Sequence, residues 1–211
     1  GMQNWDGKIK YITKTGQFKI GLLPSVYKRC IELGIKPIIV DMRQPLPKVS
    51  KVVTQIGKYK LRPEQEKAVK AILSNKLGET PFQIGVLDYT VNAGKTLIMS
   101  ALYLSYKKQL KTLLITNDSD WLNQARDEFK QYLPGEDITF VQGKVLNWSN
   151  FTIGMVQSIS RNMKYYQNEL AKIDRVLIDE ADQGGSKQYQ NVITRLFNTR
   201  VRIGLSGTIY M

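Results

Sequence analysis

Residues 83–104 read QIGVLDYTVNAGKTLIMSALYL and combine a short apolar run, a polar loop and a long apolar run. The first run has the length of a buried strand, and the second, which follows Lys95, has the length of a helix. Gly94-Lys95-Thr96 stands where that helix begins. Backbone N–H groups at a helix N-terminus attract an anion, and a lysine beside them adds positive charge. The stretch therefore predicts a strand, a phosphate-binding loop and a helix.

Each residue of this loop has an expected role. Lys95 would neutralise the outer phosphates, and the Thr96 hydroxyl would ligate Mg²⁺. The residues expected to face the phosphates through their backbone amides are Asn92, Ala93 and Gly94. Tyr89 occupies the place where the full pattern has a first glycine. Because GKT occurs often by chance, its position directly after an apolar strand is what favours the phosphate-binding interpretation.

The chain from Leu61 onward alternates apolar strands with amphipathic helices. The expected strands are residues 83–88, 112–116, 138–141, 152–155, 175–179 and 202–206. The expected helices are residues 63–74, 95–107, 119–132, 158–162 and 188–197. Short buried strands that alternate with helices predict a mainly parallel sheet covered on both faces, which is an α/β fold.

A second site is predicted where VLIDEAD, residues 176–182, ends an apolar strand in carboxylates. Ligands bind at the carboxyl edge of such sheets. Asp179 would hold Mg²⁺, and Glu180 would orient or accept a proton from an attacking water. The alternative is a solvated acidic helix start, which the helix dipole favours.

Two further segments have both a functional and a structural interpretation. In LRPEQ, residues 61–65, Gln65 could contact an adenine edge, or the segment could simply start a helix with Pro63 in its first turn. In GLSGT, residues 204–208, the two hydroxyls could link nucleotide state to a bound strand, or they could belong to an ordinary turn.

The first 60 residues differ from the rest in charge. They hold 12 basic and 3 acidic side chains, which gives this segment a net charge of +9. The whole 211-residue chain has 31 basic and 18 acidic side chains and a net charge of +13. Such a basic segment suggests nucleic acid as a partner, with a lysine-rich soluble surface as the alternative. We expect a small basic α+β module over residues 1–45, with a hairpin, a helix ended by Gly34 and a strand at 37–41, and a linker over residues 46–60.

Composition excludes several classes of protein. With no histidine and one cysteine, Cys30, the chain has no zinc finger of the usual ligand set and no Ser-His-Asp triad. No apolar run approaches the length of a membrane span, and no signal-peptide pattern is present. We therefore expect no membrane partner and a location in the cytoplasm, of a bacterium or of a host infected by a phage.

LRPEQ, NAGKT, IDEAD and LSGT, in this order and spacing, resemble the motifs of the first RecA-like domain of superfamily-two helicases over residues 61–211. Among these, the chain resembles phage UvsW-type DNA helicases, through NWDGKI at residues 4–9 and GLLPSVYKRCIELG at residues 21–34. The resemblance implies a RecA-like P-loop NTPase domain that uses ATP and Mg²⁺ to remodel branched DNA in recombination, repair or replication-fork rescue.

The resemblance also assigns roles by position. Lys95 would hold the β- and γ-phosphates, Asp179 and Glu180 would be the Walker B pair, and Arg62 with Gln65 would lie near the adenine. The residues that would couple ATP to nucleic acid are Ser206, Gly207 and Thr208. Those that would contact the nucleic-acid backbone are Thr116, Asn117, Gln157 and Ser158.

Departures from the family pattern keep other interpretations open. Asp182 stands where many UvsW-like relatives have histidine, so the string also resembles DEAD-box RNA helicases, and a restriction-type DNA translocase shares the same motor. Tyr89 in the phosphate loop leaves a non-catalytic nucleic-acid clamp as a third class. We expect the second RecA-like domain, the partner that supplies arginine fingers, to be absent from these 211 residues. The fragment would then be a nearly inactive monomer.

Overall fold

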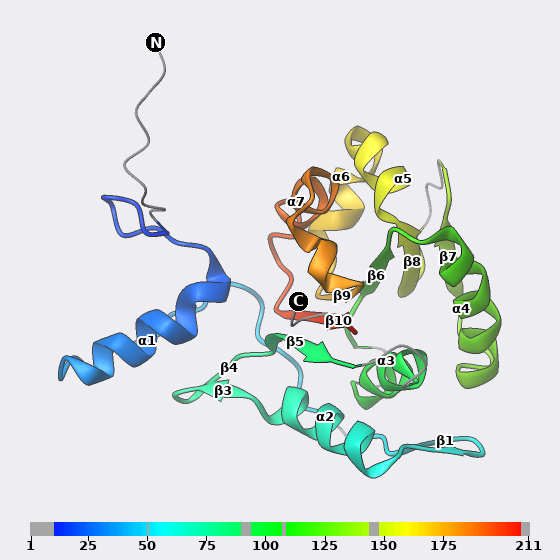
Figure 1. The fold of residues 1–211 in the computed structure, drawn as a ribbon, viewed down its shortest axis with the longest axis horizontal. Helices are drawn as coiled ribbons and strands as arrows, with labels where there is room; N and C mark the ends of the chain where they lie inside the picture. Colours follow the sequence, from blue (N-terminus) through cyan, green and yellow to red (C-terminus); the bar gives the residue numbers. More distant parts are fainter. Residues whose placement is uncertain (1–10, 50, 90–93, 107–108, 144–147, 208–211) are drawn as a thin grey trace. The chain divides into compact units, whose positions relative to one another are not determined.

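The computed structural model describes residues 11–49, 51–89, 94–106, 109–143 and 148–207 (Figure 1). The chain divides into two compact units, the first ending at Asp41 and the second beginning at Met42. The module, linker and domain boundaries expected from the sequence, at residues 45 and 60, remain predictions.

Within residues 11–41, the first unit contains one α-helix, one 3-10 helix and one isolated β-bridge. Ile12 and Phe18 form an antiparallel bridge around Gly16, η1 spans Ile20–Leu22, and α1 spans Leu23–Glu32. Gly34 follows α1 with a left-handed φ of 74°, as the sequence predicted for the residue that ends this helix. Residues 37–41, expected as a strand, form no regular element, and no described strand pairs with them.

The second unit is built on a six-stranded parallel sheet with the order β5-β10-β9-β6-β8-β7. The bounds of these strands, in that order, are Ile84–Asp88, Val201–Ser206, Arg175–Asp179, Thr112–Thr116, Phe151–Met155 and Ile138–Val141. Every pair in the sheet is parallel. The predicted α/β class with a parallel sheet is confirmed, and the strands begin and end within a residue of their expected positions.

Helices cover both faces of this sheet (Figure 1). On one face lie α2 (Pro63–Ser74), α3 (Lys95–Ser105) and α4 (Ser119–Tyr132). On the other lie α5 (Val156–Arg161), α6 (Met163–Ala171) and α7 (Lys187–Ile193). The helix expected at 158–162 is α5, and it breaks at Asn162, where α6 begins. Short hairpins join β1 (Gln55–Ile56) to β2 (Tyr59–Lys60) and β3 (Lys76–Leu77) to β4 (Thr80–Pro81).

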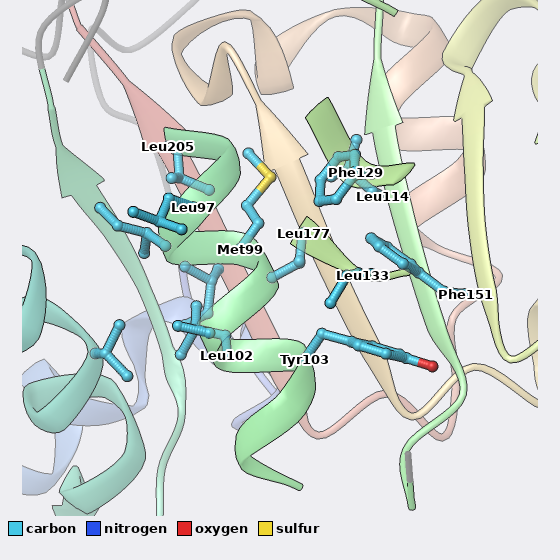
Figure 2. Close-up of a cluster of buried hydrophobic side chains, with 14 of the residues drawn as sticks. Leu97, Met99, Leu102, Tyr103, Leu114, Phe129, Leu133, Phe151, Leu177 and Leu205 are labelled. Carbon is cyan, nitrogen blue, oxygen red and sulfur yellow. The ribbon is translucent and has the colours of Figure 1, made fainter. Parts of the chain in front are cut away.

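Strand alternation divides the core into two layers. Leu114 and Leu177 pack under α3, whereas Leu113 and Val176 face α5 to α7. Figure 2 shows Met99 and Tyr103 of α3 directed at the first of these layers. The ring of Phe151 stacks on Tyr103 with centroids 4.8 Å apart and meets Phe129 edge-on at 5.1 Å. This layer fixes α3, and with it Lys95 at the first position of the helix, to the sheet.

A buried guanidinium also links α3 to the sheet. Arg175, at the start of β9, is fully buried and donates to the Thr112 hydroxyl at 2.8 and 3.0 Å and to the Leu102 carbonyl of α3 at 2.5 Å. Burial lowers the pKa of Arg175 to about 10, so the side chain stays charged at neutral pH. Nothing in the sequence pattern of β9 indicated this link.

The stretch expected as a linker is part of the second unit and packs on its core. Leu46, Val49, Val52 and Val53 contact its core, and the Val53 N–H donates to the Ser105 hydroxyl at 3.1 Å. Arg43 donates to the Thr199 carbonyl at 2.6 Å. Among the described residues, no helix is both long and apolar enough to cross a bilayer.

Phe151→Ala should lower the free energy of unfolding by about 3–5 kcal/mol, because it removes two aromatic contacts and leaves a cavity in a fully buried layer. Phe197→Ala is the matched control, since this ring is 64% exposed and its loss should change stability by less than about 0.5 kcal/mol. Urea denaturation followed by circular dichroism measures both. Equal effects of the two substitutions would contradict the assigned core.

Candidate active site

The predicted site residues meet at one edge of the sheet. Because β5, β9, β10 and β6 are parallel, their carboxyl ends lie together, and α3 begins directly beside them. Lys95 is the first residue of α3, Asp179 the last of β9, and Ser206 the last of β10. The structure therefore brings Lys95 into contact with Glu180, which is 85 positions away in the sequence.

Lys95 lies between the two carboxylates. Its Nζ donates to Glu180 Oε1 at 2.6 Å and stands 3.5 Å from Asp179 Oδ1. Lys95 is 9% exposed and Asp179 1% exposed, so water screens the ion pair with Asp179 little. Asp179 Oδ1 is buried and accepts no hydrogen bond, which leaves an oxygen able to take a ligand.

Burial disfavours the ionised form of Asp179. The pKa of this carboxyl is raised to about 6 from an ordinary value of 3.8, with burial as the largest cause, Lys95 opposing it and the neighbouring Glu180 adding to it. Tyr189, whose hydroxyl donates to the Asp179 backbone carbonyl at 3.3 Å, covers the same strand end, and burial raises its pKa as well. The carboxylate is thus held in a poorly solvated position that costs folding free energy at neutral pH.

Gly94 and Gln65 approach each other closely. Gly94 has a left-handed φ of 77°, and a Cβ built there would lie 2.6 Å from Gln65 Nε2. Gln65 is 2% exposed, and its Oε1 accepts from the Arg62 N–H at 2.9 Å, which caps α2. Arg62 pairs with Glu64 at 2.8 Å. The helix-start interpretation of LRPEQ is therefore present in the structure, and the contact of Arg62 and Gln65 with adenine remains a prediction.

Tyr89 is accommodated at the position where a glycine was expected. Its N–H donates to the Ser206 carbonyl at 2.8 Å, which extends the β5–β10 pairing by one residue. The ring is half-buried against the core under α3. Burial, and then the Glu64 carboxylate, raise the pKa of its phenol. Asn92 and Ala93, in the loop that follows, lie outside the described residues.

The turn after β9 is held by close contacts. Among the described non-glycine residues, Glu180 is the one with a positive φ, 50°, and it leads into η2 (Ala181–Gly185). A Cβ at Gly204 of β10 would lie 2.5 Å from the Ala181 side chain. The Ser206 hydroxyl and Asp182 Oδ1 are joined by a hydrogen bond of 2.8 Å. Ser206 thus contacts the carboxylate string directly, Gly207 follows it, and Thr208 lies outside the described residues.

The residues predicted to contact nucleic acid lie beside the same turn, with different orientations. The Asn117 amide donates to Gln183 Oε1 in η2, and Gln157 Nε2 donates to the Asn117 carbonyl at 3.2 Å. The Ser158 carbonyl accepts from the Asn162 amide at 2.9 Å. Thr116 is fully buried, and its hydroxyl accepts from the Asp118 N–H at 3.1 Å. The Thr116 hydroxyl is therefore directed into the loop that starts α4.

A cavity of about 360 Å³ extends from Lys95 and Glu180 along one face of α4. Its lining residues are Gly94, Lys95, Thr96, Trp121, Gln124, Glu128, Tyr132 and Glu180. The sequence motifs alone did not connect α4 with the site. The available signal was the helical spacing of Trp121, Gln124 and Glu128 directly after a strand that ends at the predicted ligand edge.

The donor atoms at this edge suit a hard cation that is shared with a ligand. The Thr96 side chain is buried at the start of α3, and Asp179 offers a buried oxygen without a hydrogen-bond partner. No group of three or more acidic, histidine or cysteine side chains that could hold a metal occurs in the described ranges. Mg²⁺ commonly takes one or two protein oxygens and completes its shell with water and phosphate oxygens, so these residues fit it.

Comparison with known proteins matches residues 58–211 to the family described as "Type III restriction enzyme, res subunit". A putative ATP-dependent RNA helicase of Acanthamoeba polyphaga mimivirus is 25% identical over 148 residues, 70% of this chain and 27% of the relative. The ATP-dependent DNA helicase uvsW of enterobacteria phage T4 is 24% identical over 98% of this chain and 43% of its own length. The chain thus spans less than half the length of these relatives.

Solved structures show the same fold. One structure of UvsW from bacteriophage T4 superposes with a TM-score of 0.70 at 21% identity and covers 98% of this chain and 77% of its own. A second UvsW structure superposes with a TM-score of 0.73 at 22% identity and covers 99% of this chain and 44% of its own. A SWI2/SNF2 ATPase core of Sulfolobus solfataricus in complex with dsDNA superposes with a TM-score of 0.58 at 22% identity, covering 75% of this chain and 34% of its own. The RecA-like fold expected for residues 61–211 is confirmed.

Asp179→Asn should raise the free energy of unfolding by about 1–3 kcal/mol at pH 7.5, because the raised pKa means that the folded state disfavours the ionised carboxylate. The cost develops as pH rises from about 4 to about 6, so the two proteins should be equally stable near pH 3.5, where this carboxyl is protonated in both the folded and the unfolded state. Urea denaturation across this pH range measures the difference. Asp127→Asn, on the exposed side of α4, is the control, and a loss of stability in Asp179→Asn at pH 7.5 would contradict the assignment.

Proposed function

The chain belongs to the family of the Type III restriction enzyme res subunit, and we propose that it is the ATP-binding half of an ATP-dependent DNA helicase or translocase that remodels branched DNA. The match to the phage DNA helicase supports this substrate class, because it extends over 98% of the chain, including the basic amino-terminal segment. The proposed roles in recombination, repair or rescue of replication forks follow from the same resemblance.

One observation carries the proposal. Lys95 stands at the N-terminus of an eleven-residue helix, next to a buried aspartate and a glutamate at the end of a central strand. The helix start and the lysine attract phosphate, and the carboxylates supply the acceptors that phosphoryl-transfer chemistry needs. The cavity beside Lys95, Thr96 and Glu180 provides the space for a phosphate chain.

Each residue of the site has a proposed role in binding or hydrolysing ATP. The Lys95 ammonium would leave the carboxylates for the β- and γ-phosphates of ATP, and the Thr96 hydroxyl with Asp179 Oδ1 would hold the cation. When bound, Mg²⁺ would neutralise charge on the phosphates. Glu180, released from Lys95, would orient the attacking water and accept its proton. Arg62 and Gln65 would face the base, and Asn92, Ala93 and Gly94 would donate backbone N–H groups to the phosphates.

Nucleic acid would lie on the loops next to this site. The proposed contacts are Thr116, through its backbone, and Asn117, Gln157 and Ser158. Ser206, with Gly207 and Thr208, would report the state of the nucleotide through the bond to Asp182. We further propose that the protein acts as a monomer in the cytoplasm of a bacterium or of a phage-infected host, and that a second RecA-like domain completes the ATP site. Without that domain, these 211 residues would bind ATP and hydrolyse it slowly.

Specific observations support three rival functions. The similarity to a putative RNA helicase, together with the DEAD string ending in Asp182, favours RNA as the substrate. The family description names a restriction enzyme subunit, which favours a restriction-type translocase. Tyr89 in the phosphate loop would suit a nucleic-acid clamp that does not use ATP. We favour DNA because the similarity to the RNA helicase extends over only 70% of the chain.

Lys95→Ala should weaken binding of a fluorescent ATP analogue by about 10- to 100-fold, because it removes one charge-assisted contact to phosphate. Affinity for forked DNA, measured by anisotropy, should change less than about twofold. Lys130→Ala, an exposed lysine of α4, is the control, and Lys95→Met keeps the packing of the side chain if the alanine variant is unstable. Unchanged nucleotide binding in both Lys95 variants would favour the clamp.

ATP turnover of the protein joined to its second RecA-like domain should rise mainly with branched DNA. The assay compares no nucleic acid, a four-way DNA junction and RNA of matched length at one salt concentration, because phosphate contacts make affinity depend strongly on salt. Greater stimulation by RNA would replace the DNA proposal with the RNA helicase. Absence of turnover under all conditions, with DNA still bound, would replace it with the clamp.

A further inference from the structure

A chain of amide contacts connects the carboxylate turn with the loops that we propose to hold nucleic acid. Gln183 of η2 accepts a hydrogen bond from the Asn117 side-chain amide, and Gln157 Nε2 donates to the Asn117 carbonyl at 3.2 Å. The three residues come from the turn after β9, the loop after β6 and the first turn of α5. Asn117 is therefore held from both sides.

The Gln183 end of this chain is tied to the catalytic carboxylates. The Gln183 N–H donates to the Glu180 carbonyl at 3.0 Å, and its own carbonyl accepts from the Ser186 N–H at 3.0 Å. Glu180 has a left-handed backbone, and the Ala181 side chain lies against Gly204 with no room for a further carbon. A change in the position of Glu180 must therefore move Gln183, because the turn between them has little space in which to deform.

At the other end of the chain of contacts, only one of the two polar atoms of the Gln157 amide forms a hydrogen bond. Its Nε2 has the Asn117 carbonyl as acceptor, whereas Oε1 is buried and has no hydrogen-bond partner. A buried amide that is only half satisfied gains from any rearrangement that brings it a donor. Gln157 thus holds the Asn117 backbone carbonyl, whereas Gln183 holds the Asn117 side-chain amide, so a shift of Gln183 acts on that side chain.

We propose that Gln183 is a positioning residue that couples the nucleotide site to the nucleic-acid site through Asn117. The inference rests on the proposed function. When nucleotide draws Lys95 away from Glu180, the turn shifts, Gln183 releases or redirects the Asn117 amide, and the affinity for nucleic acid changes. This link is separate from the bond between Ser206 and Asp182, because it reaches the loop after β6 and not the end of β10.

The test measures coupling and not affinity alone. A slowly hydrolysed ATP analogue with Mg²⁺ is added to the 211-residue chain, and the Kd for a fluorescein-labelled forked DNA is measured with and without it. The ratio of the two values is the coupling factor, which we expect to be about fivefold or more for the unchanged chain. Gln183→Ala should bring it close to one, because the Asn117 amide is then released with and without nucleotide. Both Kd values of the variant should lie near the value that the unchanged chain has with nucleotide.

Two control variants distinguish a positioning role of Gln183 from a nonspecific effect of substitution in this region. Gln183→Glu keeps an oxygen acceptor for the Asn117 amide and should retain the coupling factor. Gln188→Ala removes an exposed glutamine on α7, five positions further along the chain, and should also leave the factor unchanged. Because Gln183 is itself exposed, thermal unfolding of Gln183→Ala should match that of the unchanged chain, so a lost coupling factor is not explained by misfolding.

Three results would overturn the inference. The first is a full coupling factor in Gln183→Ala, and the second is an unchanged chain that binds both ligands without coupling them. The third is a Gln183→Ala variant that loses DNA affinity equally with and without nucleotide, which would make Gln183 a contact and not a positioning residue. Failure of the unchanged chain to bind the ATP analogue at all would instead refute the proposed function, and the inference with it.

Discussion

Parallel register in the six-stranded sheet decides where every polar group of the site lies. Leu113 to Ile115 of β6 pair with Val176 to Ile178 of β9, and β10 pairs with β5 and β9 in the same direction, so the strands end together. The apolar layers on both faces fix this register, because a slip by one residue would turn each buried side chain to the opposite face. The ends of β5, β9 and β10 and the start of α3 are then placed without further adjustment.

Unfavourable local features gather at this edge, and the surrounding packing offsets them. Asp179 is an acid in a poorly solvated position, Glu180 has a left-handed backbone, and Gln157 has a buried oxygen without a partner. Each lowers the stability of the folded chain. Away from this edge, the core beneath α3 consists of well-packed rings and aliphatic side chains. Such a distribution is typical of a site that is maintained for its chemistry and not for its contribution to stability.

The sequence predicted the sheet and the meeting of Lys95 with Asp179 and Glu180, because both depend on local patterns. Apolar runs bounded by polar loops define the strands, and residues at the ends of parallel strands must share an edge. It did not predict that the Gln65 oxygen would cap its own helix, that the Thr116 hydroxyl would turn inward, or that α4 would line the cavity. Those features depend on side-chain orientation and on contacts between distant segments. In the first unit, residues 37–41 have the composition of a strand. They form none, because no strand among the described residues pairs with them.

The engagement of Lys95 with two carboxylates also sets a threshold for which anions can occupy the site. Any anion must replace the 2.6 Å contact with Glu180 and the nearby charge of Asp179, and this cost is the same whatever the anion is. A singly charged ion such as chloride attracts Lys95 less strongly than the two carboxylates that it would displace. A triphosphate accompanied by a divalent cation makes stronger electrostatic interactions with the site. In the proposed function, the ion pair would therefore favour a polyphosphate over small singly charged anions. This discrimination would follow from the contacts of Lys95 within the folded chain itself.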